Sequence, residues 1–410
     1  MQNSRFWKQA SLSVTLCLFQ FMNAADAAGI FQQLNLDSAL STAKEKGKIL
    51  IIDFTASWCG PCHKMEQTTW ADPAVVKWIS ENGIAVQYDV DKDKDVSERF
   101  KIQAMPSLVI FTPGDVSKEF DRQIGYQTST ELLEWLAAVK NGETNLDLLK
   151  HKVEKFGGKG GEEEAKTRFR LAHLLAEAGK FADAADQYTW LWQELPNVMP
   201  KDGRTLRLSS MPRPISMLAM RSTDAKQRFE KLRDDAEKNS AIPEFVVLNM
   251  ALGQDDRTLQ WFDKAKNDPS QKANIQSVDL LLESVLARKD RLKDVLALYP
   301  DPIARIRELS TQSSKMAEKT AVIGNIEPFM TSAPLLYCAT LAAHKESDAK
   351  KIAVEILKLR DSEEMRHNLV KVAIATKQVR KEQLKWAEDD TDLTKRLQEA
   401  LASSTPSKKK

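Results

Sequence analysis

Cys59 and Cys62, two cysteines separated by a glycine and a proline, are the residues of this chain best suited to chemistry. Thiols at this spacing can close into a disulfide and reopen with little movement of the backbone. An apolar, β-branched segment at 48–55 precedes the pair, and a helix-like segment follows it. A cysteine pair where a strand leads into a helix is typical of a redox centre, so we predict that the two sulfurs exchange disulfides.

The two cysteines are expected to have different roles. Cys59 would lie at the helix amino terminus, where unpaired N–H groups favour a negative sulfur, so it should be the attacking thiolate. Cys62 lies one turn into the helix, should be less exposed, and would resolve the mixed disulfide. Gly60 lets a substrate approach closely, and Pro61 stiffens the turn and begins the helix without wasting a hydrogen-bond donor.

Two ionisable residues near the pair are candidate helpers. Asp53 lies six residues before Cys59 within the apolar segment. Burying a carboxylate there costs free energy of folding unless the group is paired or has a function, so we expect Asp53 to accept the proton of Cys62. A solvent-facing aspartate at a strand end is the alternative. His63 follows Cys59 by four residues, on the same helical face, and when protonated would stabilise the Cys59 thiolate. A solvated surface histidine is its alternative.

Met105 and Pro106 precede a segment with the pattern of a strand. A proline at the start of a strand near a thiol pair suggests a cis peptide bond that presents backbone groups to an extended peptide. An ordinary trans proline at a strand start is the alternative.

The surrounding sequence predicts the elements that hold these residues. Between about 29 and 140, apolar β-branched segments alternate with helical patterns. Strands are expected at 30–34, 48–55, 84–90, 107–111 and 118–124, and helices at 37–46, after Cys59, at 93–100 and at 130–140. A break in the second helix is expected at Asp72 and Pro73. The fold class is therefore α/β, with a mixed sheet between helices.

The rest of the chain has a helical pattern. Glycines at 157–161 favour a flexible connection, so we place the α/β domain at 28–145, a glycine-rich linker at 146–161, an all-α domain at 162–402 and a basic polar tail at 403–410. Residues 165–196, with small Ala172 and Ala184 beside Phe181, Tyr188 and Pro196, resemble one tetratricopeptide repeat, and 280–300 is a weaker match. Helices are also expected at 243–252, 335–343, 348–359 and 365–376. An irregular helical bundle is the alternative.

Charge and composition limit the possible partners. The 410 residues include 60 basic and 58 acidic side chains, whereas a nucleic-acid-binding domain usually has a basic excess. Hydrophobic residues make up 42% of the chain, enough for packed cores. We expect a folded protein of two or more domains without a nucleic-acid partner.

Residues 1–27 have the pattern of a signal peptide. Arg5 and Lys8 precede an apolar stretch at 10–22, and small residues at 25–27 offer a cleavage site. The stretch is too short for a membrane anchor, although an uncleaved anchor is an alternative. No other segment is apolar and long enough to span, so we expect a periplasmic or secreted mature protein without a membrane span.

Residues 29–140 resemble the thioredoxin-fold family. The motifs that carry this resemblance are Asp53 in its strand, Trp58 before the cysteine pair, the segment 89–91, and Met105-Pro106. The run 62–75 looks most like the carboxy-terminal thioredoxin-like domain of transmembrane disulfide reductases. Two positions depart from the family pattern: Thr55 replaces a frequent tryptophan, and Gln87 replaces a lysine that partners the buried acid.

The resemblance implies roles for the site residues. Cys59 would be the nucleophile, Cys62 the resolving thiol, Asp53 the buried proton acceptor and Pro106 the cis-proline of a substrate groove. The membrane part of the reductase family is missing from this sequence, so an external electron donor or acceptor is expected. The resemblance also implies substrate proteins that carry disulfides.

Other functions fit parts of the pattern. A cysteine pair followed by His63 matches c-type haem attachment, but the strand before it and the proline motif after it do not fit. A zinc site would need more ligands than Cys338, His63 and four distant histidines offer. We therefore expect neither metal nor cofactor apart from the redox disulfide. Cys338, in an apolar helix, should be a buried small hydrophobe.

The sequence thus predicts an extracytoplasmic thiol–disulfide oxidoreductase whose helical domain selects a partner. Reduction of substrate disulfides is favoured over their formation. The alternative is a helical-repeat binding protein whose first domain is only a docking module without essential redox activity.

Overall fold

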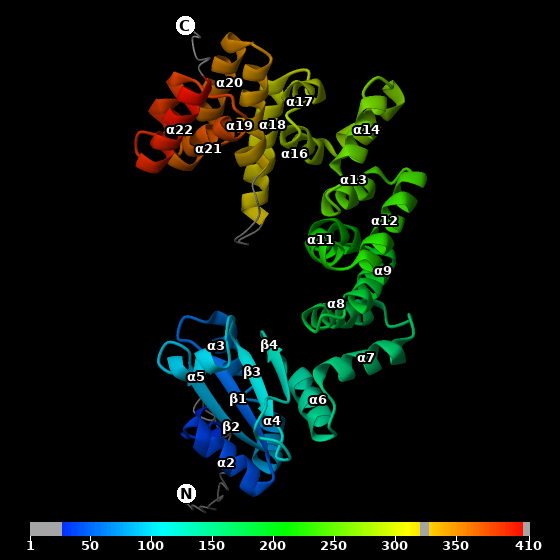
Figure 1. Cartoon of the computed structure of the whole chain (residues 1–410), viewed down its shortest axis with the longest axis vertical. Helices are drawn as coiled ribbons and strands as arrows, with labels where there is room; N and C mark the ends of the chain where they lie inside the picture. The colour runs from blue at the N-terminus through cyan, green and yellow to red at the C-terminus, as the bar shows by residue number, and fades with distance from the viewer. Residues whose placement is uncertain (1–26, 320–327, 405–410) are drawn as a thin grey trace, which may run out of the picture. The chain divides into compact units, whose positions relative to one another are not determined.

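The computed structural model describes residues 27–319 and 328–404 (Figure 1). The chain divides into two compact units, one ending at Lys159 and the other beginning at Gly160. The predicted signal peptide, apart from Ala27, lies outside the described residues, as does the tail from 405 onward. None of the helices within the described ranges has the length and apolar character needed to cross a membrane.

The first unit is built on a four-stranded mixed sheet. The strand order is β2-β1-β3-β4, with β1 parallel to β2 and antiparallel to β3, which is itself antiparallel to β4. The strands are β1 (Ile49–Thr55), β2 (Gly83–Asp89), β3 (Ser107–Phe111) and β4 (Asp121–Ile124). Asp53, in the central strand β1, pairs in register with Gln87 of β2 and Leu108 of β3.

Helices cover both faces of this sheet (Figure 1). Alternate residues of β1 point to opposite sides: Ile49 and Ile51 belong to one buried cluster, and Leu50, Ile52 and Phe54 belong to another. The helices are α1 (Ala27–Ile30), α2 (Leu36–Lys46), α3 (Gly60–Thr68), α4 (Pro73–Asn82), α5 (Lys94–Arg99), α6 (Ser129–Lys140) and α7 (Asn145–Phe156). The predicted α/β fold with a mixed sheet between helices is confirmed.

Local chemistry determines where the helices next to the site begin. Asp72 caps α4, its carboxylate accepting the Ala74 N–H at 2.8 Å, and Pro73 occupies the first turn, as the sequence predicted. The predicted strand at 30–34 is wrong. Its first residue ends the short helix α1, and the segment adds only one isolated bridge, between Phe31 and Ala85.

The segment predicted as a flexible linker, 146–161, is mostly helical. Helix α7 covers Asn145–Phe156, and Thr144 and Asp147 form a capping box at its start. Leu149 and Val153, four residues apart, bury one stripe of this helix. Gly157 ends it with φ 57°, in the left-handed region that favours glycine. The glycine-rich part is therefore confined to the residues after Phe156, and the boundary between the two units falls within it.

The second unit is helical throughout its described part, which confirms the predicted helical domain. Its elements are α8 (Gly161–Glu177), α9 (Phe181–Val198), α10 (Gly203–Ser210), α11 (Pro212–Arg221), α12 (Thr223–Lys238), α13 (Ile242–Ala251), α14 (Asp255–Ala265), η1 (Pro269–Gln271), α15 (Lys272–Gln276), α16 (Asp279–Arg288), α17 (Leu292–Leu298), α18 (Pro302–Lys319), α19 (Pro328–Ala342), α20 (Glu346–Leu359), α21 (Glu363–Ala375), η2 (Lys381–Trp386) and α22 (Thr391–Ser404).

Helices α8 and α9 form the repeat-like pair expected from the sequence. Ala172 and Ala184 are fully buried, as small residues at a close helix contact should be. Pro196 lies inside the last turn of α9 and does not end the helix. A proline cannot donate to the carbonyl four residues earlier, and that carbonyl, of Trp192, instead accepts from the Arg207 guanidinium at 3.0 Å.

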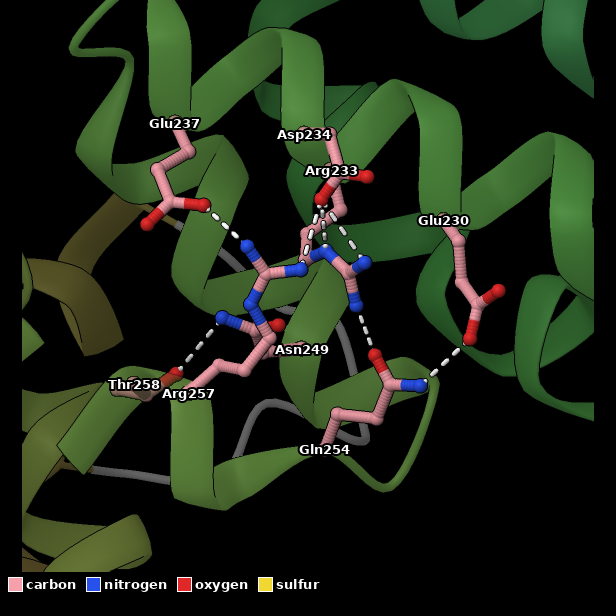
Figure 2. A network of polar contacts seen from close by, with 8 residues as sticks. All are labelled: Glu230, Arg233, Asp234, Glu237, Asn249, Gln254, Arg257 and Thr258. Carbon is pink, nitrogen blue, oxygen red and sulfur yellow. Dashed lines mark hydrogen bonds and ion pairs between the residues drawn. The ribbon is translucent and has the colours of Figure 1, made fainter. Parts of the chain in front are cut away.

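Polar contacts tie later helices of this unit together. Figure 2 shows the buried Arg233 of α12 bonded to Asp234 and to Gln254, which precedes α14. Arg257 of α14 pairs with Asp234 at 2.8 Å and with Glu237. Gln254 in turn donates to Glu230 at 2.6 Å, so α12 is fixed to the start of α14 by charge-assisted hydrogen bonds.

Candidate functional site

Cys59 and Cys62 form a disulfide at the start of α3. The S–S distance is 2.06 Å and the Cα atoms are 5.3 Å apart. Cys59 is 5% exposed and Cys62 is 2% exposed, so both residues of the pair are buried. Both pack in a small buried cluster with Ala56, against which Val90 and Met105 also pack.

Cys59 is the residue that caps α3. Its sulfur accepts the Cys62 N–H at 3.2 Å, and Pro61 lies in the first turn. The sulfur therefore faces the amino terminus of a nine-residue helix, where N–H groups and the helix dipole stabilise negative charge. This arrangement favours the thiolate form of Cys59 once the disulfide is reduced.

Asp53 is buried at the centre of the sheet, with 2% exposure, and is not a solvent-facing residue. Its Oδ2 accepts from the Gln87 amide at 2.9 Å, and its Oδ1 has no hydrogen-bond partner among the described residues. Burial raises the pKa of Asp53 to about 7, the Gln87 hydrogen bond lowers it, and the Glu66 carboxylate raises it further. A carboxyl with this pKa can take up and release a proton near neutral pH.

Asp53 does not touch the cysteines through a hydrogen bond. Within residues 27–319 and 328–404, none of its hydrogen bonds reaches Cys59 or Cys62. A proton could then pass to it through a water molecule or after a small movement.

His63 is exposed, but both of its ring nitrogens have partners. Nε2 lies 2.8 Å from the Ser57 carbonyl oxygen, and Nδ1 lies 3.1 Å from Glu66 Oε2. Both partners are acceptors, so only the protonated ring, which donates from both nitrogens, satisfies them. The Ser57 hydrogen bond and then the Glu66 carboxylate accordingly raise the pKa of His63.

Trp58 is 67% exposed next to the pair, and its indole N–H donates to Asp91 Oδ2 at 2.8 Å. The bond holds an aromatic surface beside Cys59, where a substrate chain can pack. Sequence reasoning gave no role to Asp91, Ser57 or Glu66. The signal for Glu66 was its spacing of three residues from His63, which places both on one face of α3.

The Met105-Pro106 peptide bond is cis, as predicted. Pro106 is buried, its carbonyl oxygen accepts the Gly125 N–H at 2.8 Å, and Met105 packs against the cysteine cluster. The proline segment, Trp58 and the cysteine pair therefore border the same part of the surface.

In the described part of the chain, the three side chains grouped closely enough to hold a metal are Glu363, His367 and Asp389, in the helical unit. Cys338 is fully buried in α19, and burial raises the pKa of its thiol to about 12, as suits a cysteine that acts as a small hydrophobe.

Comparisons with known proteins point to one family. Residues 36–140 match the family model described as a thioredoxin-like domain. An H-type thioredoxin of Fagopyrum esculentum is 42% identical over 95 residues, covering 23% of this chain and 75% of that protein. An H-type thioredoxin of Oryza sativa subsp. indica is 35% identical over 91 residues, covering 22% of this chain and 67% of its own length.

Solved structures of thioredoxins are also similar in sequence to part of this chain. The crystal structure of a poplar thioredoxin h is 28% identical in sequence and covers 26% of this chain and 87% of its own, with a TM-score of 0.21. The similarity is thus to thioredoxins, and the finer resemblance to transmembrane disulfide reductases stays a prediction.

Proposed function

Because the chain belongs to the thioredoxin family, we propose that it is an extracytoplasmic oxidoreductase that reduces disulfides of substrate proteins. Its thiol–disulfide oxidoreductase class follows from its thioredoxin relatives and from the cysteine pair at disulfide distance. The observation that carries the proposal is the Cys59 sulfur capping the amino terminus of α3.

The reaction begins with the reduced pair. The Cys59 thiolate attacks one sulfur of a substrate disulfide, forms a mixed disulfide, and releases the other substrate sulfur as a thiolate that takes up a proton. Cys62 then loses its proton toward Asp53 and attacks the Cys59 sulfur. The substrate leaves as a dithiol that has gained two electrons, and the enzyme keeps the Cys59–Cys62 disulfide. An external thiol reductant restores the dithiol.

Extracytoplasmic location is proposed from residues 1–27, whose basic start, apolar stretch and small residues match a signal peptide. Partner selection by the helical unit is proposed from its helical-repeat-like architecture, because stacked helix pairs offer extended surfaces for protein ligands.

The direct test is insulin reduction with dithiothreitol as the electron source. The full chain should accelerate precipitation of the insulin chains well above the blank, and the Cys59→Ser, Cys62→Ser double variant should not. A Cys338→Ala variant is the control, since that thiol is buried away from solvent and should leave the rate unchanged. A wild-type rate equal to the blank would overturn the proposal, and full cellular function of the double variant would favour a docking role instead.

Whether the protein reduces or oxidises its substrates is tested by measuring the reduction potential of the Cys59–Cys62 disulfide in glutathione or dithiothreitol buffers. A potential near about −270 mV, as in thioredoxins, supports a reductase, whereas one near about −120 mV would make the pair an oxidant.

A further inference from the structure

His367 of α21, in the helical unit, is a buried imidazole that faces two carboxylates. It is 8% exposed, and its Nε2 lies 2.8 Å from Asp389 Oδ1. Glu363 lies one helical turn earlier on α21, so its side chain is on the same face as His367. One ligand atom of each of the three residues lies within 4.8 Å of the other two. An imidazole nitrogen and two carboxylate oxygens therefore share one small volume.

The elements that carry these side chains are held firmly. Ser362 caps α21 by accepting the Met365 N–H at 3.2 Å, and this cap sets where the helix begins and hence where Glu363 and His367 point. Asp389 lies in the turn between η2 and α22. Buried residues of α21, η2 and α22 belong to one hydrophobic cluster, so the helix and the turn are packed on a common core.

The His367–Asp389 hydrogen bond explains only part of the group. Glu363 is exposed, and within residues 27–319 and 328–404 no ion pair involves its carboxylate. Arg366, next to His367 in sequence, is paired with Asp361 at 2.5 Å. Two carboxylates this close repel each other when both are ionised. A cation bound between the three ligand atoms would turn that repulsion into attraction.

The chemistry of the three ligand atoms suits zinc. Imidazole nitrogens bind Zn²⁺ at about 2.0–2.1 Å and carboxylate oxygens at about 2.0–2.2 Å, so two ligands of one ion lie at most about 4.4 Å apart. The Nε2 and Oδ1 atoms of His367 and Asp389 already meet this limit, and Glu363 is exposed and can rotate to meet it. Mg²⁺ and Ca²⁺ prefer oxygen ligands throughout, so the imidazole disfavours them.

We propose that Glu363, His367 and Asp389 form a zinc-binding site that links the start of α21 to the turn before α22. Nε2 of His367 loses its hydrogen to solvent on binding, each carboxylate contributes an oxygen, and water completes the four ligands. His367 and Asp389 are 22 residues apart in sequence, so no local motif reveals the group. The inference is independent of the proposed reductase activity, since it uses neither Cys59 nor Cys62.

The experiment is calorimetric titration of the full chain, freed of metal by a chelator, with Zn²⁺ alone at about pH 7.5. The protein is used with the Cys59–Cys62 disulfide closed, so that these sulfurs do not bind the ion. We expect one Zn²⁺ per chain, not displaced by a large excess of Mg²⁺. Glu363→Gln removes one ligand at an exposed position, leaves the His367–Asp389 hydrogen bond in place, and should weaken binding by about tenfold or more.

Two matched controls separate coordination from charge and from surface histidines. Glu364→Gln makes the same change in charge at the next position, which is also exposed but outside the group, and should keep the wild-type affinity. His173→Gln removes an exposed imidazole that lies 3.2 Å from Glu177, four residues later, and should keep it as well. Absence of stoichiometric zinc binding by the wild type, equal affinities of wild type and Glu363→Gln, or the same loss in either control would overturn the site.

Discussion

Asp53 lies in an unusual environment for a carboxyl group. It is buried in the central strand with an amide, not a lysine, as its partner. Without a cation nearby, the charged form lacks compensation, so the proton stays bound up to neutral pH. Burial with the Gln87 amide as its partner therefore holds the pKa of Asp53 at about 7.

This leads to a prediction about stability. The pKa of Asp53 rises from 3.8 in the unfolded chain to about 7 in the folded protein. Between these values the folded state binds the extra proton, so stability falls as pH rises from about 4 to 7 and then levels off. The isosteric Asp53→Asn variant, which cannot ionise, should be more stable than wild type at pH 8, by roughly 4 kcal/mol at most.

Urea unfolding of both oxidised proteins at pH 4, 5.5, 7 and 8 measures the difference. The stability gained by Asp53→Asn should grow up to about pH 7 and then stay constant. A difference that does not vary with pH would show that Asp53 titrates like an exposed aspartate.

Residue types and spacing were enough to predict that Cys59 pairs with Cys62, that Asp53 is buried in its strand and that the bond before Pro106 is cis. The catalytic roles of these residues stay predictions. The Trp58–Asp91 and His63–Ser57 contacts could not be predicted in the same way. They depend on how the loop before α3 folds back, and the first joins residues 33 positions apart in sequence.

Among the elements of the first unit, the capped start of helix α6 determines which of its residues face the sheet. Thr128 caps α6 through a capping box in which its side chain and that of Glu131 bond to each other's backbone N–H. Helix α6 packs Leu132, Trp135 and Leu136 into the core of one sheet face, so its start position fixes that packing.

We expect Thr128→Ala to lower the free energy of unfolding by about 1 kcal/mol, because it leaves helix N–H groups unpaired. Thr130→Ala is the control: it makes the same change at an exposed position two residues later and should be neutral or slightly stabilising, since alanine favours helix. Chemical denaturation of both variants measures the two effects. Equal stabilities of the variants would contradict a capping role.

Element types were largely predictable from apolar periodicity, and element ends were not. Residues 146–161 were expected to be a linker because glycines dominate one end, yet the spacing of Leu149 and Val153 was the stronger signal. Pro196 is accommodated inside α9, where Arg207, distant in sequence, replaces the missing donor to the Trp192 carbonyl. Contacts of that kind are invisible to a local pattern.

For the whole molecule, a redox unit and a helical unit share one chain. If substrates are attacked at Cys59, removal of Cys62 should trap them, since the mixed disulfide then has no internal thiol to resolve it. The full-length Cys62→Ser variant should accumulate protein adducts in its natural compartment, visible as bands that disappear on reduction.

The Cys59→Ser, Cys62→Ser double variant is the control and should form no such adducts, because Cys338 is buried in α19. Adducts of equal intensity in both variants would contradict attack by Cys59. Their absence from the Cys62→Ser variant would remove the support for protein substrates.

The most direct measurement is the rate at which iodoacetamide alkylates Cys59 in the reduced full chain between pH 5 and pH 10, followed by mass spectrometry. A sulfur that caps α3 should react with a midpoint near about pH 7, well below the ~8.5 of a free cysteine, while Cys62 reacts later. A midpoint at or above that of a free thiol for both cysteines would contradict the account.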